Sequence, residues 1–261
     1  MLDMLRFDPG PDCENSGGLV TRRYLLAGAA FAPLGIAAGV LQIDQDPVAG
    51  TLPASDWSTF LERAVPAGKA ALEDGDIERY LYVIASLAAG LRDVPLPEFS
   101  RFGVFDPPVE QGINHRGSPF LVIHWKLAPR AILPAHCHPH TSVCTVGLAG
   151  EARLRSFEVH GSAPDFNTDA STRFRIRETK SEVMGPGRIS TLSPSRNNIH
   201  CFEAGPDGAR GIDITSPHGG DGKFSFLTLD YDTPVDPEQR LFAATWTGRD
   251  ENGAIHPVVG G

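Results

Sequence analysis

Leu133-Pro134-Ala135-His136-Cys137-His138-Pro139 is the most informative stretch of the chain, because it places two histidines two positions apart. Successive side chains of a β-strand point to opposite faces, so His136 and His138 share one face if this stretch is a strand. A third histidine, His200, follows 62 residues after His138, within Asn198-Ile199-His200-Cys201-Phe202. Two imidazoles from one strand and a third from another can hold a divalent transition metal. The sequence therefore predicts a metal site on a β-sheet.

Hydrophobic and polar residues alternate with a period of two from about residue 118 onward, which is typical of half-buried strands. The chain is also rich in turn formers, with 28 glycines and 22 prolines. Short strands separated by such turns favour a β-sandwich or barrel over βαβ units. The expected strands are Phe120–Leu127, Ser142–Leu148, Ala152–Val159, Thr172–Arg177, Ile189–Leu192, Gly211–Ile214 and Phe224–Asp230.

Residues 56–93 have a helical pattern instead, since apolar residues recur there at spacings of three and four. Pro66-Ala67-Gly68 and Asp74-Gly75-Asp76 are expected to interrupt it. We therefore predict two or three short helices that pack on the β-domain, after a linker at residues 42–54.

The N-terminus contains a twin-arginine pattern, Thr21-Arg22-Arg23-Tyr24-Leu25-Leu26, followed by a 17-residue uncharged stretch that ends at Leu41. This combination is typical of bacterial twin-arginine export signals, and the stretch is short for a membrane span. We expect a periplasmic or exported protein with no stable membrane insertion after signal cleavage. Because no clear Ala-x-Ala site follows, an uncleaved anchor stays open, as does an amphipathic or buried helix behind a chance arginine pair.

The net charge of −9 argues against a nucleic-acid partner, which would require a basic surface. Three cysteines follow the signal, Cys137, Cys144 and Cys201, and an odd number does not make a disulfide scaffold. We divide the chain into an export signal (1–41), a linker with a helical segment (42–100), a β-barrel (101–240) and a C-terminal tail (241–261). The oligomeric state is not indicated.

The spacing after the two histidines resembles the first metal-binding motif of the cupins, small jelly-roll proteins. That motif has His-x-His, a glutamate after three or four residues, and a glycine after six more. Here Val143 stands at the glutamate position and Gly150 at the glycine position. The resemblance thus implies a site of three histidines without a carboxylate.

The local sequence resembles the thiol dioxygenases of the cysteamine dioxygenase and plant cysteine oxidase type, over roughly residues 95–232. This family implies a mainly β cupin jelly-roll barrel, here with a short N-terminal helical segment, and a ferrous iron, Fe(2+), bound by His136, His138 and His200. The family's tyrosine-containing segment has no clear counterpart, because Ser216-Pro217-His218-Gly219-Gly220 stands in its place. The segments that carry the resemblance are residues 134–139, Gly150, Arg153, Ser156-Phe157-Glu158, Asn198–Phe202 and Ile212–Pro217.

Three neutral imidazoles leave a bound ferrous ion its full positive charge, which lowers the pKa of a thiol and favours the thiolate. The implied reaction adds both atoms of O₂ to the sulfur of a small thiol and gives a sulfinic acid. Asp213 is the expected catalytic residue, because it could orient a ligand histidine or a substrate amine; it could also be a buried hydrogen-bond partner only. Free cysteine, cysteamine, 3-mercaptopropionate and an N-terminal cysteine stay open as substrates.

Two alternatives remain on this evidence: a cupin enzyme that uses Zn, Mn or Ni, and a non-catalytic cupin that binds a metal or ligand. Arg153 and Arg155 could hold a substrate carboxylate or pair at the surface. Cys137 and Cys201 alternate away from the histidines and are expected to be packed thiols. The other histidines are expected at the rim (His140) or in structural positions (His124 and His160).

Overall fold

A computed structural model describes residues 55–103, 105–164, 171–218, 225–249 and 255–256. The expected export signal lies outside the described residues. The helices are α1 (Trp57–Glu73) and α2 (Ile77–Ala88), and within the described ranges no helix is both long and apolar enough to cross a membrane. The strands are β1 (Ser100–Phe102), β2 (Val109–Arg116), β3 (Leu121–Leu127), β4 (Ile132–Cys137), β5 (Thr141–His160), β6 (Phe174–Met184), β7 (Ile189–Leu192), β8 (Ile199–Pro217), β9 (Ser225–Leu229), β10 (Leu241–Trp246), β11 (Gly248–Arg249) and β12 (Ile255–His256).

Each helix begins at an aspartate whose side chain accepts a hydrogen bond from the first turn. Asp56 accepts from the backbone of Thr59, and Asp76 accepts from that of Arg79. The predicted break at Pro66 is wrong, because α1 continues through it. Its buried residues, Phe60, Ala64, Gly68 and Ala71, follow one helix face. Packing of that face therefore outweighs the loss of one backbone donor at the proline.

The long strands β5 and β8 organise the sheet. They pair antiparallel from Thr141↔Pro217 to Phe157↔Ile199. The expected separate strands 142–148 and 152–159 are therefore one strand, irregular between Gly147 and Ala152 rather than broken. At the bend, a Cβ on Gly150 would collide with the carbonyl oxygen of Gly208, and φ of Gly150 is +63°. Only glycine allows the two strands to approach this closely here.

Six strands close into a ring in the order β8, β4, β9, β10, β6 and β5, with β5 returning to β8. The far halves of β5 and β8 continue into a second sheet with β2, β3 and β7. This confirms the predicted mainly β barrel with a short helical segment before it. The barrel continues beyond residue 240, where we placed its end, because residues 241–246 form β10 between β6 and β9.

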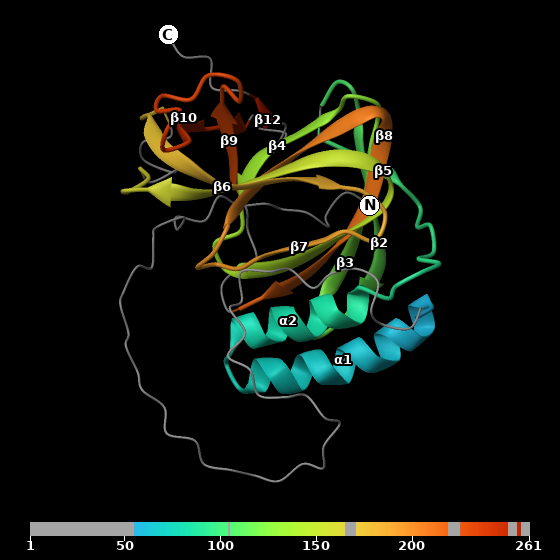
Figure 1. Cartoon of the computed structure of the whole chain (residues 1–261). Coiled ribbons are helices and arrows are strands. Elements are labelled where there is room, and N and C mark those ends of the chain that lie inside the picture. Colours follow the sequence, from blue (N-terminus) through green and yellow to red (C-terminus); the bar gives the residue numbers. More distant parts are fainter. Residues whose placement is uncertain (1–54, 104, 165–170, 219–224, 250–254, 257–261) are drawn as a thin grey trace.

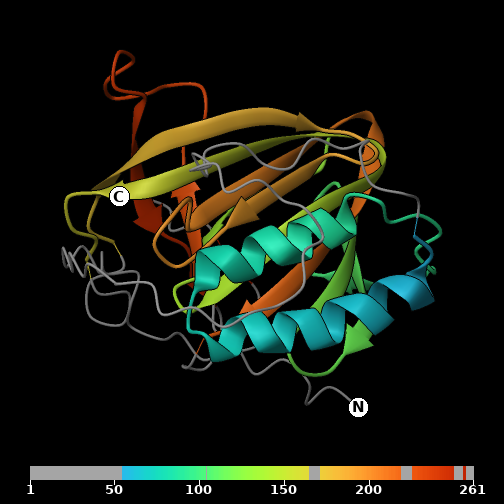
Figure 2. The same cartoon turned by 60° about the horizontal axis from the view of Figure 1, so that its bottom comes forward.

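The two helices lie side by side across the outer face of the second sheet (Figure 2). Tyr80, Leu81 and Ile84 of α2 pack there against Ile212 and other apolar residues of β3, β5, β7 and β8. The helices thus cover one side of the second sheet, and its other side faces the interior between the two sheets.

Strand β8 separates two further apolar clusters. Phe202 belongs to the cluster with Trp125, Leu154 and Phe226, whereas Cys201 belongs to the cluster inside the six-stranded ring. Because side chains alternate along a strand, His200 shares the face of Phe202. Strand β8 therefore presents His200 to the interior between the two sheets.

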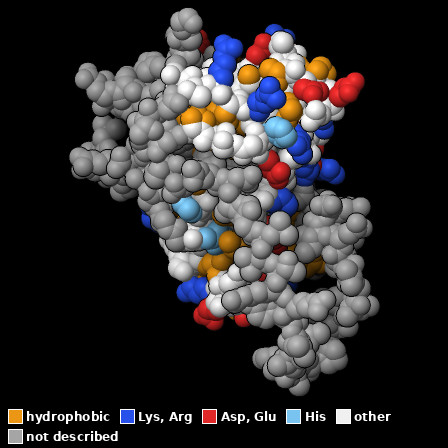
Figure 3. Space-filling view, turned by 90° about the vertical axis from the view of Figure 1, so that its left-hand side faces the viewer, with side chains coloured by type: hydrophobic (Ala, Val, Ile, Leu, Met, Phe, Trp, Pro, Cys, Tyr) orange, Lys and Arg blue, Asp and Glu red, His pale blue; other side chains and the backbone are white. Residues whose placement is uncertain are grey.

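Basic and acidic side chains are interspersed on the face shown in Figure 3, and its coloured residues form no broad patch of one charge.

Candidate metal centre

His136 and His200 are directly paired neighbours on β4 and β8. Their Nε2 atoms lie 3.0 Å apart, and Nε2 of His138 lies 3.2 Å from Nε2 of His200. The nearest potential ligand atoms of all three imidazoles lie within 4.8 Å of one another. The structure thus brings together the three predicted metal ligands.

A register shift in β4 helps to direct His136. Leu133 pairs with Phe202 and His136 with His200, so β4 contains one more residue than β8 between these pairs. Such a bulge re-aims the side chain that follows it. Nδ1 of His136 donates to the carbonyl oxygen of Pro134 at 2.8 Å, since a carbonyl can only accept. In the neutral imidazole, Nε2 therefore keeps a lone pair that faces the other two histidines.

Asn198 holds His138, which follows the last residue of β4. The backbone N–H of His138 donates to the backbone oxygen of Asn198 at 3.0 Å and to its Oδ1 at 2.8 Å. Asn198 stands two residues before His200 in sequence, so one short segment supplies one histidine and positions another. From sequence, Asn198 was only part of the segment that resembles the thiol dioxygenases, and no role was predicted for it.

Burial keeps all three imidazoles neutral. It lowers the pKa of His136 to about 4 and holds the pKa values of His138 and His200 well below their usual range. The neighbouring histidines lower the last two pKa values further, because two protonated rings would repel each other. A neutral imidazole is the form that binds a metal.

The spacing of the nitrogens fits a divalent metal. Ligands about 2.1 Å from a metal are about 3.0 Å apart on one face of an octahedron and about 3.4 Å apart at tetrahedral corners. The two separations from Nε2 of His200, 3.0 and 3.2 Å, lie within this range. Three histidine ligands leave at least one further coordination position of a divalent metal open.

Aromatic rings pack against the histidines. The ring of His136 lies 5.3 Å from that of Phe226, and the ring of His200 lies 4.9 Å from that of Phe202. Both phenylalanines are at most 2% exposed. These contacts fix the imidazole planes and exclude water from one side of the centre.

Asp213 lies on the second half of β8, and its Oδ1 accepts two hydrogen bonds. Oγ1 of Thr145 donates at 2.6 Å and Nε1 of Trp125 at 3.3 Å. Burial raises the pKa of Asp213 to about 6 despite these two donors. Among the described residues, none donates a hydrogen bond to the second oxygen, Oδ2.

Packed aromatic rings connect Asp213 to the histidines. The indole of Trp125 lies 5.1 Å from the ring of Phe202, which in turn contacts His200. The role of Asp213 in catalysis stays a prediction. Thr145 and Trp125 were not predicted as its partners, because they lie 68 and 88 residues away in sequence.

Arg155 pairs with Glu178 through two hydrogen bonds inside the six-stranded ring, at 2.9 and 3.3 Å. The two side chains are only 12% and 6% exposed. Its guanidinium also lies over the rings of Phe157, Tyr231 and Phe242. Arg155 is thus engaged in a buried ion pair, in place of the surface pair or substrate contact considered from sequence, and Arg153 is exposed.

The expected packed positions of the two cysteines beside the histidines agree with the structure, since Cys137 and Cys201 are both at most 3% exposed. Burial raises the pKa of the Cys201 thiol to about 12, so it is not a thiolate near neutral pH.

Two tyrosines approach the regions next to the site. The hydroxyl of Tyr231 accepts a hydrogen bond from the backbone of Ala135 at 2.9 Å, directly at the bulge before His136. The hydroxyl of Tyr80 is hydrogen-bonded to Ser216. Ser216 lies on the face of β8 that α2 covers, so Tyr80 lies on the opposite face from Asp213.

The remaining histidines lie outside the cluster of three. His124 is fully buried, and its Nδ1 donates to Asn114 at 2.9 Å. His160 accepts at Nδ1 from Arg177 at 2.8 Å. His140 is half-buried, and its backbone oxygen accepts from the N–H of His218 at 2.8 Å.

Residues 101–220 match the family model PCO_ADO, that of the plant cysteine oxidases and cysteamine dioxygenases. The match spans just under half of the 261 residues and includes the three histidines and Asp213. It supports an oxidoreductase of the thiol dioxygenase class. No curated protein matches the chain.

Solved structures with similar barrels are distant in sequence. A protein with a double-stranded β-helix domain from Klebsiella pneumoniae is 15% identical, with 44% of this chain and 81% of that one covered and a TM-score of 0.32. The cupin domain of Schizosaccharomyces pombe Cnp3 is 12% identical, with 42% and 64% covered and a TM-score of 0.30. An oxalate oxidase in complex with glycolate is 15% identical, with 41% and 46% covered and a TM-score of 0.30. Likenesses at this distance give no information on substrate or metal.

Proposed function

We propose that the protein is an iron-dependent dioxygenase that converts a small thiol to its sulfinic acid with both atoms of O₂. The observation that carries this proposal is the cluster of three neutral imidazoles, two buried and one half-buried, within the segment that matches the thiol dioxygenase model. Val143 at the position where many cupins have a glutamate supports a site without a carboxylate ligand.

His136, His138 and His200 would hold the iron through Nε2. A ferrous ion bound there would supply a positive charge that stabilises a thiolate, together with open positions for the thiol and O₂. The chain keeps the three nitrogens deprotonated by burial and fixes the rings through Pro134, Asn198 and the two phenylalanines. These residues therefore prepare the geometry before the reaction begins.

Asp213 would position the substrate or a proton. Its Oδ1 is held by Thr145 and Trp125, which leaves Oδ2 to accept from a substrate ammonium or a water. Since burial raises its pKa to about 6, Asp213 is close to the range in which it can also exchange a proton near neutral pH. A substrate with an amine near the thiol, such as cysteine, cysteamine or an N-terminal cysteine, matches this arrangement better than 3-mercaptopropionate.

The direct test is O₂ uptake by anaerobically iron-loaded protein with these four thiol classes. His138→Ala is the inactive variant, and His160→Ala is the matched control, because it removes a histidine outside the cluster. We expect thiol-dependent uptake with a sulfinate product in the wild type and the control, and none in His138→Ala.

Absence of uptake from all four thiols, with iron bound at the histidines, would contradict the proposal. Metal analysis of the protein as purified separates the alternatives, because a Zn, Mn or Ni cupin would retain one of those metals. Binding of metal without any turnover would favour a non-catalytic cupin.

We also propose export through the twin-arginine route, on the sequence at Arg22 and Arg23 alone. The test is a fusion of residues 1–41 to a reporter that is active only after export in folded form. Replacement of both arginines by lysine should abolish export; export that persists would contradict this proposal.

A further inference from the structure

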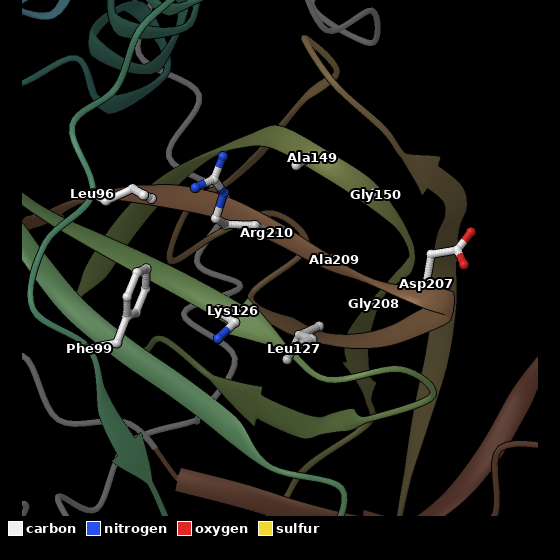
Figure 4. A pocket seen from close by; sticks show the side chains of 10 residues that line it. All are labelled: Leu96, Phe99, Lys126, Leu127, Ala149, Gly150, Asp207, Gly208, Ala209 and Arg210. Atoms are coloured by element: carbon white, nitrogen blue, oxygen red, sulfur yellow. The ribbon is translucent and has the colours of Figure 1, made fainter.

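A pocket lies on the outer face of β3 and β8 (Figure 4), with a volume of about 440 Å³. Leu96 and Phe99, from the segment before β1, form one wall, and β3 and β8 form the other. Gly150 and Gly208 line the pocket toward the end where Asp207 lies. A Cβ on Gly208 would lie 2.7 Å from the carbonyl oxygen of Leu127, so the strands are too close there for side chains to fill the space.

Two cations, Lys126 and Arg210, and one carboxylate, Asp207, line the pocket. Lys126 and Arg210 are direct neighbours across β3 and β8, an arrangement of like charges that destabilises a sheet. Glu110 on β2 balances Lys126 at 2.7 Å. Arg210 is half-buried and has no ion pair or hydrogen bond with any other described side chain. The carboxylate of Asp207 lies at the far end of the pocket from Arg210 (Figure 4).

A buried histidine next to these cations is also incompletely paired. His124 is fully buried two residues before Lys126 on β3; because its Nδ1 donates to Asn114, its Nε2, unpaired within the described part of the chain, is an acceptor and offers no donor to an anion. Its ring contacts Phe99 edge to face at 5.2 Å, and the ammonium of Lys126 lies 5.8 Å from the ring centre of the same phenylalanine. Aromatic, apolar and cationic groups therefore meet in one place.

We infer that this pocket binds a small carboxylate with an apolar or aromatic body. The guanidinium of Arg210 matches a carboxylate through two parallel hydrogen bonds, and Leu96 and Phe99 offer an apolar surface for the rest of the ligand. Contact with the apolar body of such a ligand would also explain why Leu96, a large apolar residue, is 64% exposed without it.

The pocket is separate from the three histidines. Side chains alternate along β3, so Trp125 points to the opposite face from His124 and Lys126. Trp125 packs against Phe202 in the interior between the two sheets, on the side of His200. The inference therefore does not depend on the proposed thiol oxidation.

Calorimetric titration of the full chain with benzoate tests the inference, with acetate and benzyl alcohol as probes that lack the apolar body or the charge. We expect saturable binding of benzoate and weaker binding of both others. Arg210→Gln should weaken benzoate binding roughly tenfold or more, because the bidentate charge is lost. Arg175→Gln, which removes an exposed arginine on β6, should bind as the wild type does.

Two further variants keep the test decisive. Asp207→Asn should tighten benzoate binding, since it removes the negative charge of the pocket, and this result does not require Arg210→Gln to fold. His138→Ala should bind benzoate unchanged while it loses metal. No benzoate binding at millimolar concentrations, or equal binding by Arg210→Gln of native thermal stability, would overturn the inference.

Discussion

The Nε2 atoms of His136 and His200 lie 3.0 Å apart, although 64 residues separate the two histidines in sequence. They are paired directly across β4 and β8, where opposite side chains are closest. The bulge at Pro134 and Ala135 then directs His136 toward His200, and Tyr231 holds the bulge from the other face. The candidate metal centre therefore depends on strand register as much as on the histidines themselves.

Loss of one imidazole should remove most of the bound metal. For His200→Ala, we expect iron content after anaerobic loading and desalting to fall from about one to below about one tenth per chain, because two nitrogens bind a divalent ion weakly. His160→Ala should retain full occupancy. Elemental analysis makes the comparison, and an unchanged iron content in His200→Ala would exclude this residue as a ligand.

Removal of the side chain that holds His138 should weaken metal binding without removing a ligand. We expect Asn198→Ala to lower metal affinity about 10- to 100-fold, because His138 loses a backbone contact that orients it. Asn198→Asp keeps an acceptor oxygen at the same position and should remain closer to the wild type. Competition with a chelator of known affinity measures both variants; equal affinities in Asn198→Ala and the wild type would contradict a positioning role.

Asp213 should make the metal-free protein less stable as the pH rises. Its pKa is raised from 3.8 to about 6, so between these values the folded state keeps a proton that the unfolded state has lost. The contribution of Asp213 to the free energy of unfolding is therefore present at low pH. It falls by about 3 kcal/mol in total as the pH rises through this window. The Asp213→Asn variant has no group that titrates at this position, and its amide oxygen can still accept from Thr145 and Trp125.

Urea unfolding of chelated protein between pH 4 and pH 8 checks this prediction. The stability of Asp213→Asn relative to the wild type should increase across this range. If the free energies of unfolding of the two proteins changed in parallel with pH, the carboxyl group of Asp213 would not be desolvated in the folded protein.

The ion pair inside the six-stranded ring should be important for stability. Glu178→Gln leaves Arg155, which is 12% exposed, without its counter-charge, and should cost about 3 kcal/mol of unfolding free energy. Asp74→Asn breaks the exposed pair with Arg79 and should cost under about 1 kcal/mol. Chemical denaturation measures the unfolding free energy of both variants. Equal, small decreases in the two would indicate that Arg155 finds another partner or reaches water.

The three histidines could be predicted from sequence because two follow the period of a strand. The third belongs to a segment, Asn198–Phe202, whose sequence resembles the thiol dioxygenases. The β-class was equally accessible, since alternation is a local property. The continuation of α1 through Pro66 was not, because it depends on how the buried face of that helix packs. The partners of Asp213 and Arg155 depend on register between distant strands, which one sequence does not indicate.

Oxygen labelling of the product tests the central claim most directly. The iron-loaded protein is supplied with ¹⁸O₂ and its best thiol, and the mass of the product is measured by mass spectrometry. Incorporation of both labelled atoms into a sulfinic acid, absent in His138→Ala, is the predicted result. A product with one labelled atom or none, or a disulfide as the only product, would contradict a thiol dioxygenase.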